Sequence, residues 1–208
     1  MSIDQLKATI SKKGGLSQAN RFNVMFTPPQ GSLLNSDPAT LIGGLASGGG
    51  LSNVVNDPRD ISLLAESVNL PSSQITTLDH IAERQSVKIP YAVIQEEVTM
   101  TFLLTNDYYI KNLFDKWGQS IIDLETYRVA YKKDIVTDVV IQQLNKQNIP
   151  IYGVKLENAF PTTIGGVALS NETADTPNKL TVTFSYDKYI VEDGLTSAIS
   201  GAGAALGL

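Results

Sequence analysis

The sequence predicts a mainly β protein with one well-supported helix. Two long segments, residues 98–104 and 180–186, alternate large apolar residues with mainly hydroxyl residues. Because successive side chains of a strand point to opposite faces, each segment buries one face and exposes the other to water. A third segment carries apolar residues at helical spacing, at Ile110, Leu113, Phe114, Trp117 and Ile121. These patterns favour a sheet or barrel wall with a helix packed against it.

The first 60 residues contain two short elements and a long loop. Apolar residues at helical spacing predict a short helix over residues 1–13, which Gly14 and Gly15 end. Alternating apolar residues predict a strand over residues 21–27. Residues 30–60 are rich in Gly, Ser, Asn and Pro and predict a long loop or insertion. Such a loop is either a mobile surface segment or a segment ordered by a neighbouring subunit.

The next segment predicts a strand followed by a projecting hairpin. Residues 61–70 read as a strand that ends at Pro71. Residues 74–80 and 85–90 read as two strands that flank a turn at residues 81–84. The predicted hairpin is our candidate for a contact between subunits, through Leu78, Asp79, His80, Ile81, Glu83 and Arg84.

The helix follows the first long strand, which we place over residues 97–105. Asn106 or Asp107 is the expected N-cap, since both residue types accept hydrogen bonds from the first turn of a helix. The apolar stripe of this helix faces the sheet, and we expect Phe114 and Trp117 to anchor it in the core.

The last third of the chain predicts further strands. Residues 127–131 form a short strand, and residues 137–145 and 149–158 form an antiparallel pair. Residues 161–170 read as a loop, and residues 179–191 read as one long final strand. The whole chain then holds about seven to nine strands, and its small, apolar end from Gly194 to Leu208 reads as a flexible or docking tail.

The composition excludes several kinds of site. The 208 residues include no Cys and one His, so neither a disulfide framework nor a thiolate metal site can form. Sixteen basic and 21 acidic residues give a formal net charge of −5. Because nucleic-acid binding draws on Lys and Arg, such a chain suits a surface past which DNA slides without sticking. No stretch reaches the about 20 apolar residues that span a bilayer.

The residues suggest no catalytic, metal or cofactor site. His80 lies in a predicted loop, and no Ser of the chain lies in a nucleophile-elbow sequence that could pair with it. We therefore interpret His80 as an exposed or interface residue. Glu96 and Glu97 are adjacent, so a strand sends them to opposite faces, which does not suit a shared acid–base site. The glycine clusters lack the Lys-Ser/Thr that follows in a phosphate-binding loop. Lys132 and Lys133 read as a solvated basic spot.

Six short segments occur in an order that resembles a known family. They are Ser17–Val24, Ala65–Pro71, Lys88–Tyr91, Val98–Phe102, Phe114–Trp117 and Tyr152–Val154 leading into Asn158–Pro161. This succession resembles the tail tube proteins of contractile-tailed, T-even-like bacteriophages. The resemblance covers residues 17–193, with residues 1–16 as an N-terminal arm, a long insertion at 30–60 and residues 194–208 as an added tail.

The resemblance implies an antiparallel β-sandwich or barrel with one flanking α-helix. Six subunits would form a ring whose inner strands join into one large β-barrel, and stacked rings would form the inner tube of a virion tail. The partners implied are other copies of the chain, the tail sheath, the baseplate and the tail terminator, with double-stranded DNA in passage and no membrane anchor. The protein would be a structural component, assembled in the bacterial cytoplasm, with no enzyme activity.

Seven strand positions are candidates for the lumen or another wet face. They are Thr99, Thr101, Lys155, Glu157, Thr181, Thr183 and Ser185. The residues leave open whether each position lies on the lumen or on the outer wall of the tube.

Alternatives from the same and from other classes stay open. The insertion and the tail also fit a tube-initiating baseplate protein or the tube of a phage-like injection system. A monomeric ligand-binding β-barrel would need a dry pocket with convergent polar groups. An enzyme is disfavoured by the inventory of residues.

Overall fold

A computed structural model describes residues 2–26, 29, 58–82, 85–170 and 176–206. Of the insertion predicted at 30–60, residues 30–57 lie outside the described residues, as do Glu83 and Arg84 of the predicted turn. The elements, in chain order, are α1 (Ile3–Lys12), β1 (Phe22–Met25), α4 (Pro58–Leu64), β2 (Ala65–Val68), β3 (Ser73–Ala82), β4 (Gln85–Gln95), β5 (Val98–Leu103), α5 (Tyr109–Ile121), α6 (Lys132–Ile135), β6 (Thr137–Leu144), β7 (Pro150–Ile164), β8 (Lys179–Ser185), β9 (Lys188–Asp193) and α7 (Gly194–Leu206).

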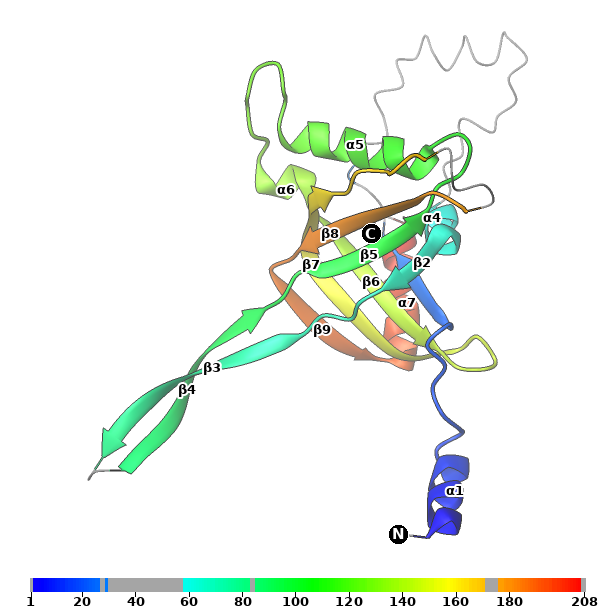
Figure 1. Ribbon diagram of the computed structural model, residues 1–208, viewed down its shortest axis with the longest axis vertical. Coiled ribbons are helices and arrows are strands. Elements are labelled where there is room, and N and C mark those ends of the chain that lie inside the picture. The colour runs from blue at the N-terminus through cyan, green and yellow to red at the C-terminus, as the bar shows by residue number, and fades with distance from the viewer. Residues whose placement is uncertain (1, 27–28, 30–57, 83–84, 171–175, 207–208) are drawn as a thin grey trace.

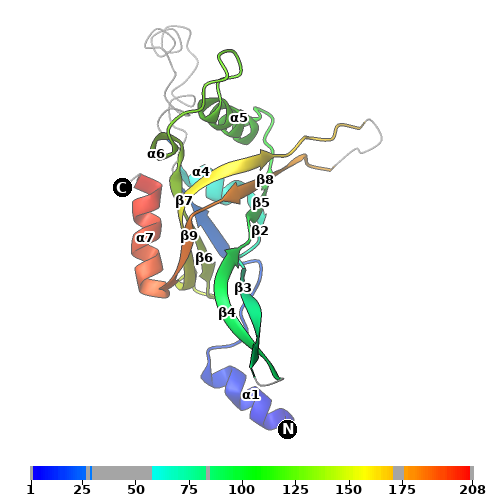
Figure 2. The same cartoon turned by 90° about the vertical axis from the view of Figure 1, so that its left-hand side faces the viewer.

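The body is an antiparallel β fold in two layers that share one long strand, which confirms the predicted fold class (Figures 1 and 2). Residues 150–159 of β7 pair with β6, and β9 pairs along the same part of β7, whereas residues 160–164 pair with β8. The first layer therefore contains β1, β6, β9 and the beginning of β7. The second layer contains β2, β5, β8 and the end of β7. A register shift between Pro161 and Thr163 lies where β7 joins the second layer.

The core fills the space between the two layers. On β5 and β8 the buried residues alternate with less buried ones, as the sequence pattern predicts. Phe26, Phe114, Trp117 and Phe184 form an aromatic cluster with ring centroids 5.8–6.2 Å apart. The apolar stripe of α5 enters this cluster, so the helix closes one end of the two-layer body.

Helix α5 begins later than predicted. Its N-cap is Tyr108, which has a φ of 53° and makes no capping hydrogen bond through its side chain. Asp107 instead lies in the preceding turn, where its carboxylate accepts hydrogen bonds from Thr105 and from the backbone N–H of Tyr109. The N-cap predicted at Asn106 or Asp107 is therefore wrong, because the left-handed residue places the start of the helix further on.

Three predicted strands have other boundaries. Residues 58–64 form helix α4, and only residues 65–68 form a strand, because Ile61 and Leu64 bury one helical face while Leu63 is exposed. Residues 127–131 form a loop with a single bridge between Ile122 and Val129 rather than a strand. The predicted final strand is divided into β8 and β9, since the chain crosses from the second layer to the first.

Two further segments extend beyond the prediction. Strand β7 continues to Ile164, into the region predicted as a loop. The tail predicted as flexible or docking forms helix α7, which packs on the outside of the first layer (Figure 2). The predicted N-terminal helix is confirmed as α1, which stands away from the body and buries none of its residues.

Candidate assembly surfaces

Hydroxyl groups line the middle of the outer face of the second layer, and Leu103 and Phe160 lie at its two ends. Thr99 lies opposite Thr183, and Thr101 lies opposite Thr181, across the pair of β5 and β8. Each of these pairs is part of a row across the sheet: Thr163 of β7 lies beside Thr183, and Ser67 of β2 lies beside Thr101. Ser185 lies on the same face, further along β8. We call this surface the hydroxyl face. Threonine fits such a place because its branched side chain favours strands while its hydroxyl stays hydrated.

Charged groups lie at the margins of the hydroxyl face. The ammonium of Lys179 pairs with the carboxylate of Glu66 at one end. At the other end Glu97 accepts a 3.3 Å hydrogen bond from the hydroxyl of Thr162. The rows of threonine between these margins are uncharged, so they offer a polyanion neither attraction nor strong repulsion.

Lys155 and Glu157 lie on a different surface from the threonines. Both point outward from the first layer, where Lys155 pairs with Asp138 at 2.8 Å and Glu157 pairs with Lys188 at 2.9 Å. The hydrogen bond to Asp138 raises the pKa of Lys155 above the ordinary lysine value, against the opposing effect of burial. The predicted set of seven wet positions therefore divides between two layers.

Helix α7 covers part of this outer face of the first layer. Gly201 is buried, and a Cβ there would lie 2.2 Å from Cε of Met25 and 2.7 Å from Nε2 of Gln142. The hydroxyl of Ser200 donates a 2.7 Å hydrogen bond to the largely buried carboxylate of Glu192. The small residues of the tail thus allow the helix to approach the sheet closely. This contact was missed from the sequence, where the small residues were the only signal of it.

The β3–β4 hairpin projects far from the body (Figure 1). Leu78 lies opposite Ile89 and His80 opposite Val87, so these four share one face. Asp79 and Ile81 lie on the other face, where Asp79 is opposite Lys88. A two-stranded ribbon in water is marginally stable at best, so a ribbon of this length gains from a second surface to pack against.

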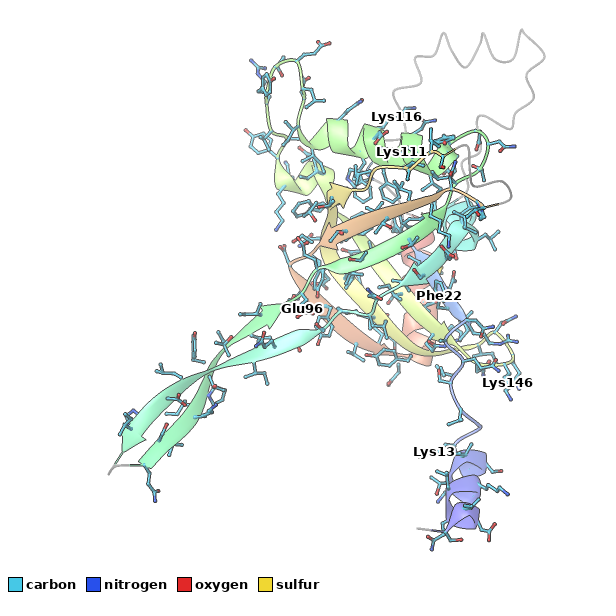
Figure 3. The ribbon with its side chains drawn as sticks, viewed as in Figure 1. Lys13, Phe22, Glu96, Lys111, Lys116 and Lys146 are labelled. Atoms are coloured by element: carbon cyan, nitrogen blue, oxygen red, sulfur yellow. The ribbon has the colours of Figure 1, made fainter. Side chains whose placement is uncertain are left out.

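The base of the hairpin is fixed to the body by two tyrosines. The hydroxyl of Tyr186 donates a 2.8 Å hydrogen bond to the carbonyl of Glu96, which lies where the hairpin meets the sheets (Figure 3). The hydroxyl of Tyr189 donates to that of Ser73 at 3.2 Å. Burial raises the pKa of Tyr186, and the neighbouring Tyr189 and Glu96 add to the effect. These contacts aim the hairpin in one direction.

The remaining predicted residues belong to the core. Phe114 and Trp117 are fully buried, and the indole N–H of Trp117 donates a 2.8 Å hydrogen bond to the carbonyl of Ile135. This bond ties α5 to α6 and leaves no polar atom of the indole unsatisfied.

The described residues hold no cluster of three or more His, Asp or Glu side chains arranged for a metal ion. An open cavity of about 290 Å³ lies between residues 13–18 and the turn that joins β6 to β7. Within the part of the chain that the structure describes, no helix has the length and apolar character to pass through a membrane.

Comparisons with solved structures show the fold. A chain from the sheath–tube complex of an extracellular contractile injection system (PVC, extended state) matches with a TM-score of 0.56 and 16% identity, over 93% of this chain and 99% of that one. A chain from the tube-terminating cap of the anti-feeding prophage matches with a TM-score of 0.51 and 17% identity, over 62% of this chain and 80% of that one. A comparison with curated protein sequences finds no match.

The family comparison agrees with the resemblance seen in the sequence. The model of a family described as phage tail tube protein matches residues 17–192, which include the strands of both layers and α5. The matched range nearly coincides with residues 17–193, the range that the resemblance covers, and the resemblance to tail tube proteins is confirmed. This chain belongs to the phage tail tube protein family.

Proposed function

We propose that six copies of this chain form a closed ring, and that stacked rings form the inner tube of a contractile phage tail through which the genome enters the host. Membership of the tail tube family supports a structural role in a tail or a tail-like particle. The observation that carries the finer proposal is the hydroxyl face of the second layer, whose rows of threonine form a wet, uncharged stretch of wall.

The hydroxyl face is the better candidate for the lumen. Helix α7 already covers part of the outer face of the first layer, whereas Thr181 is exposed and Thr99, Thr101, Thr183 and Ser185 are half-exposed. A lumen lined by neutral hydroxyls lets DNA slide because it supplies no cations to hold phosphates. Lys155 and Glu157 then belong to the outer wall or to a contact between subunits.

The second layer also has strand edges that a ring would close. Among the described strands, β2 pairs with β5 alone, and residues 160–164 of β7 pair with β8 alone. Unpaired edges invite pairing with another chain, and a closed ring removes them. Pairing between β2 of one copy and the end of β7 of the next would join the second layers into one barrel.

The hairpin is the proposed contact between successive rings. Its exposed apolar side chains include Leu78, Val87, Ile89 and Ile94. Burial of such residues stabilises an interface by about 25 cal/mol for each Å² removed from water, before the cost of association.

We further propose the division into an N-terminal arm (1–16), a tube domain (17–193) with its insertion and a tail (194–208). A surrounding sheath, the baseplate and a tail terminator are the expected partners, in a particle assembled in the bacterial cytoplasm. The fold shared with a chain of the injection-system complex supports one second candidate, the tube of a phage-like injection system. A baseplate protein that initiates the tube has the same expected surfaces.

Negative-stain electron microscopy of the purified chain, over a series of concentrations, tests the proposal. We expect six-fold rings or hollow tubes above a threshold concentration. A chain that stays monomeric at every concentration, and that also fails to extend tubes from added baseplates, would contradict the proposal and favour a monomeric binding protein.

A further inference from the structure

The loop that joins α5 to α6 is an exposed projection with several large apolar side chains. Residues 122–131, which we call the aromatic loop, extend beyond α5 at the end of the molecule that is opposite α1 (Figures 1 and 2). Tyr127 is 79% exposed and Tyr131 is 78% exposed, and Leu124 and Val129 are nearly as open. Exposed tyrosines on one loop mark a candidate surface for protein binding, because tyrosine is enriched among the residues that dominate binding energy.

The aromatic loop is built to hold one conformation. The carboxylate of Asp123 accepts hydrogen bonds from the backbone N–H of Glu125 at 3.0 Å and from the hydroxyl of Thr126 at 2.5 Å. The backbone N–H of Tyr127 donates to the carbonyl of Asp123 at 2.7 Å, and Tyr127 takes a φ of 53° to close the turn. Since the loop is ordered before it binds, it loses little entropy on binding.

The hydrogen bonds of Asp123 also stabilise its negative charge within the loop. They hold the pKa of this carboxyl below the ordinary value, the hydroxyl of Thr126 having the largest effect. The carboxylate is thus partnered inside the loop and needs no partner from outside. The other two charges of the loop, on Glu125 and Arg128, are of opposite sign.

The hairpin offers a matching surface at the far end of the molecule. Figures 1 and 2 place its outer part and the aromatic loop on opposite sides of the body. The face that carries Leu78, His80, Val87 and Ile89 continues through Ala92 to Ile94, and the described residues on it include no Asp, Glu, Lys or Arg. The loop and this face therefore each expose large apolar side chains.

A stack of rings needs two different surfaces at opposite ends of each subunit. Head-to-tail contacts join one patch of a molecule to a second, unlike patch of the next molecule, and they repeat without closing. We infer that the aromatic loop of one copy receives the apolar face of the β3–β4 hairpin of a second copy in the neighbouring ring. This inference rests on the proposed stacking of rings and adds the surface on which the hairpin docks.

The cost of desolvating charge favours the hairpin over α1 as the occupant. Helix α1 also exposes apolar residues, Ile3 and Leu6, at the end of the molecule away from the aromatic loop. It carries Lys7 and Lys12 as well, whereas the apolar face of the hairpin brings no charge that must be desolvated against the loop. Helix α1 is therefore the alternative that the experiment must separate.

Disulfide trapping tests the inference in the full chain. The natural chain has no Cys, so a Leu78→Cys, Tyr127→Cys variant contains one designed pair. Oxidation of assembled tubes should give a ladder of dimers, trimers and longer chains on non-reducing gels, because each subunit carries both partners. The matched control, Leu6→Cys with Tyr127→Cys, should give no ladder.

The outcomes separate the inference from the proposed function. A ladder from the control pair alone assigns the loop to α1 and overturns the inference, and tubes without a ladder from either pair overturn it as well. A natural chain that forms neither rings nor tubes defeats the proposed function itself.

Charge exchange keeps the inference testable if the cysteine pair stops assembly. Tyr127→Glu alone and Val87→Lys alone should each raise the concentration needed for tubes at least tenfold, with the circular dichroism spectrum unchanged. Combined in one chain, the two substitutions should restore much of the loss, because opposite charges then meet across the contact. Tubes that form at the natural concentration from either single variant would overturn the inference.

Discussion

Replacing Trp117 by Phe tests how much the buried indole of α5, with its hydrogen bond to Ile135, stabilises the fold. The substitution leaves the carbonyl of Ile135 without its buried donor, which costs about 1–3 kcal/mol. It also removes about 40 Å³ from a side chain with no exposed surface, which at about 24 cal/mol per Å³ adds about 1 kcal/mol. We therefore expect the free energy of unfolding to fall by about 2–4 kcal/mol.

Urea denaturation monitored by circular dichroism measures this change, because the variant has lost the only Trp of the chain and with it the Trp fluorescence. The measurement uses a concentration below that of ring formation, because assembly adds stability of its own. Tyr131→Phe is the matched control, since it removes a polar atom from an exposed ring, and we expect a change within about 0.5 kcal/mol. A loss below about 1 kcal/mol for Trp117→Phe would mean that the indole hydrogen bond and its packing contribute little to stability.

Three other predictions concern packing and charge. Gly194→Ala places a Cβ 2.1 Å from the carbonyl oxygen of Pro150, and the backbone cannot move aside cheaply. Thermal unfolding should therefore show a loss of stability of about 1–3 kcal/mol. The control Gly166→Ala, whose Cβ meets no atom within 4 Å, should change stability little. Lys155→Met breaks a half-exposed ion pair and should lower the free energy of unfolding by at most about 1 kcal/mol. Because the pKa of Lys155 is raised in the folded state, this contribution is present below about pH 10 and is lost as the pH rises above it. Equal losses at pH 7 and pH 12 would contradict this prediction. The pKa of Asp187 is lowered, mainly by its hydrogen bond from Lys132, so its contribution to stability is present above about pH 4 and is lost as the pH falls through the folded pKa. An acid titration in which the stability of Asp187→Asn has the same pH dependence as that of the natural chain would contradict this prediction.

Much of the second layer could be predicted from local sequence. The alternation in residues 98–103 and 180–185 has a period of two, which a strand with one buried face requires, and β5 and β8 follow it. The stripe of α5 is equally local. The segment around Ile61 forms a helix where the sequence predicts a strand, because a short apolar run fits either element and only its packing decides between them.

The division of the wet positions depends on long-range pairing. Lys155 and Thr181 both point outward from strands, and their local patterns are alike. They lie on different layers because β7 changes partners along its length, from β6 and β9 to β8. Helix α7 depends on tertiary contact in the same way, since glycine disfavours helix by about 1 kcal/mol per residue and close packing on the sheet must offset this cost.

A helical reconstruction of the assembled tube by cryo-electron microscopy shows directly which face of the subunit lines the lumen. We expect rings of six in which Thr99, Thr101, Thr181 and Thr183 line the lumen, while α7 lies outside the inner barrel. A tube with the hydroxyl face turned outward and α7 lining the channel would contradict this expectation.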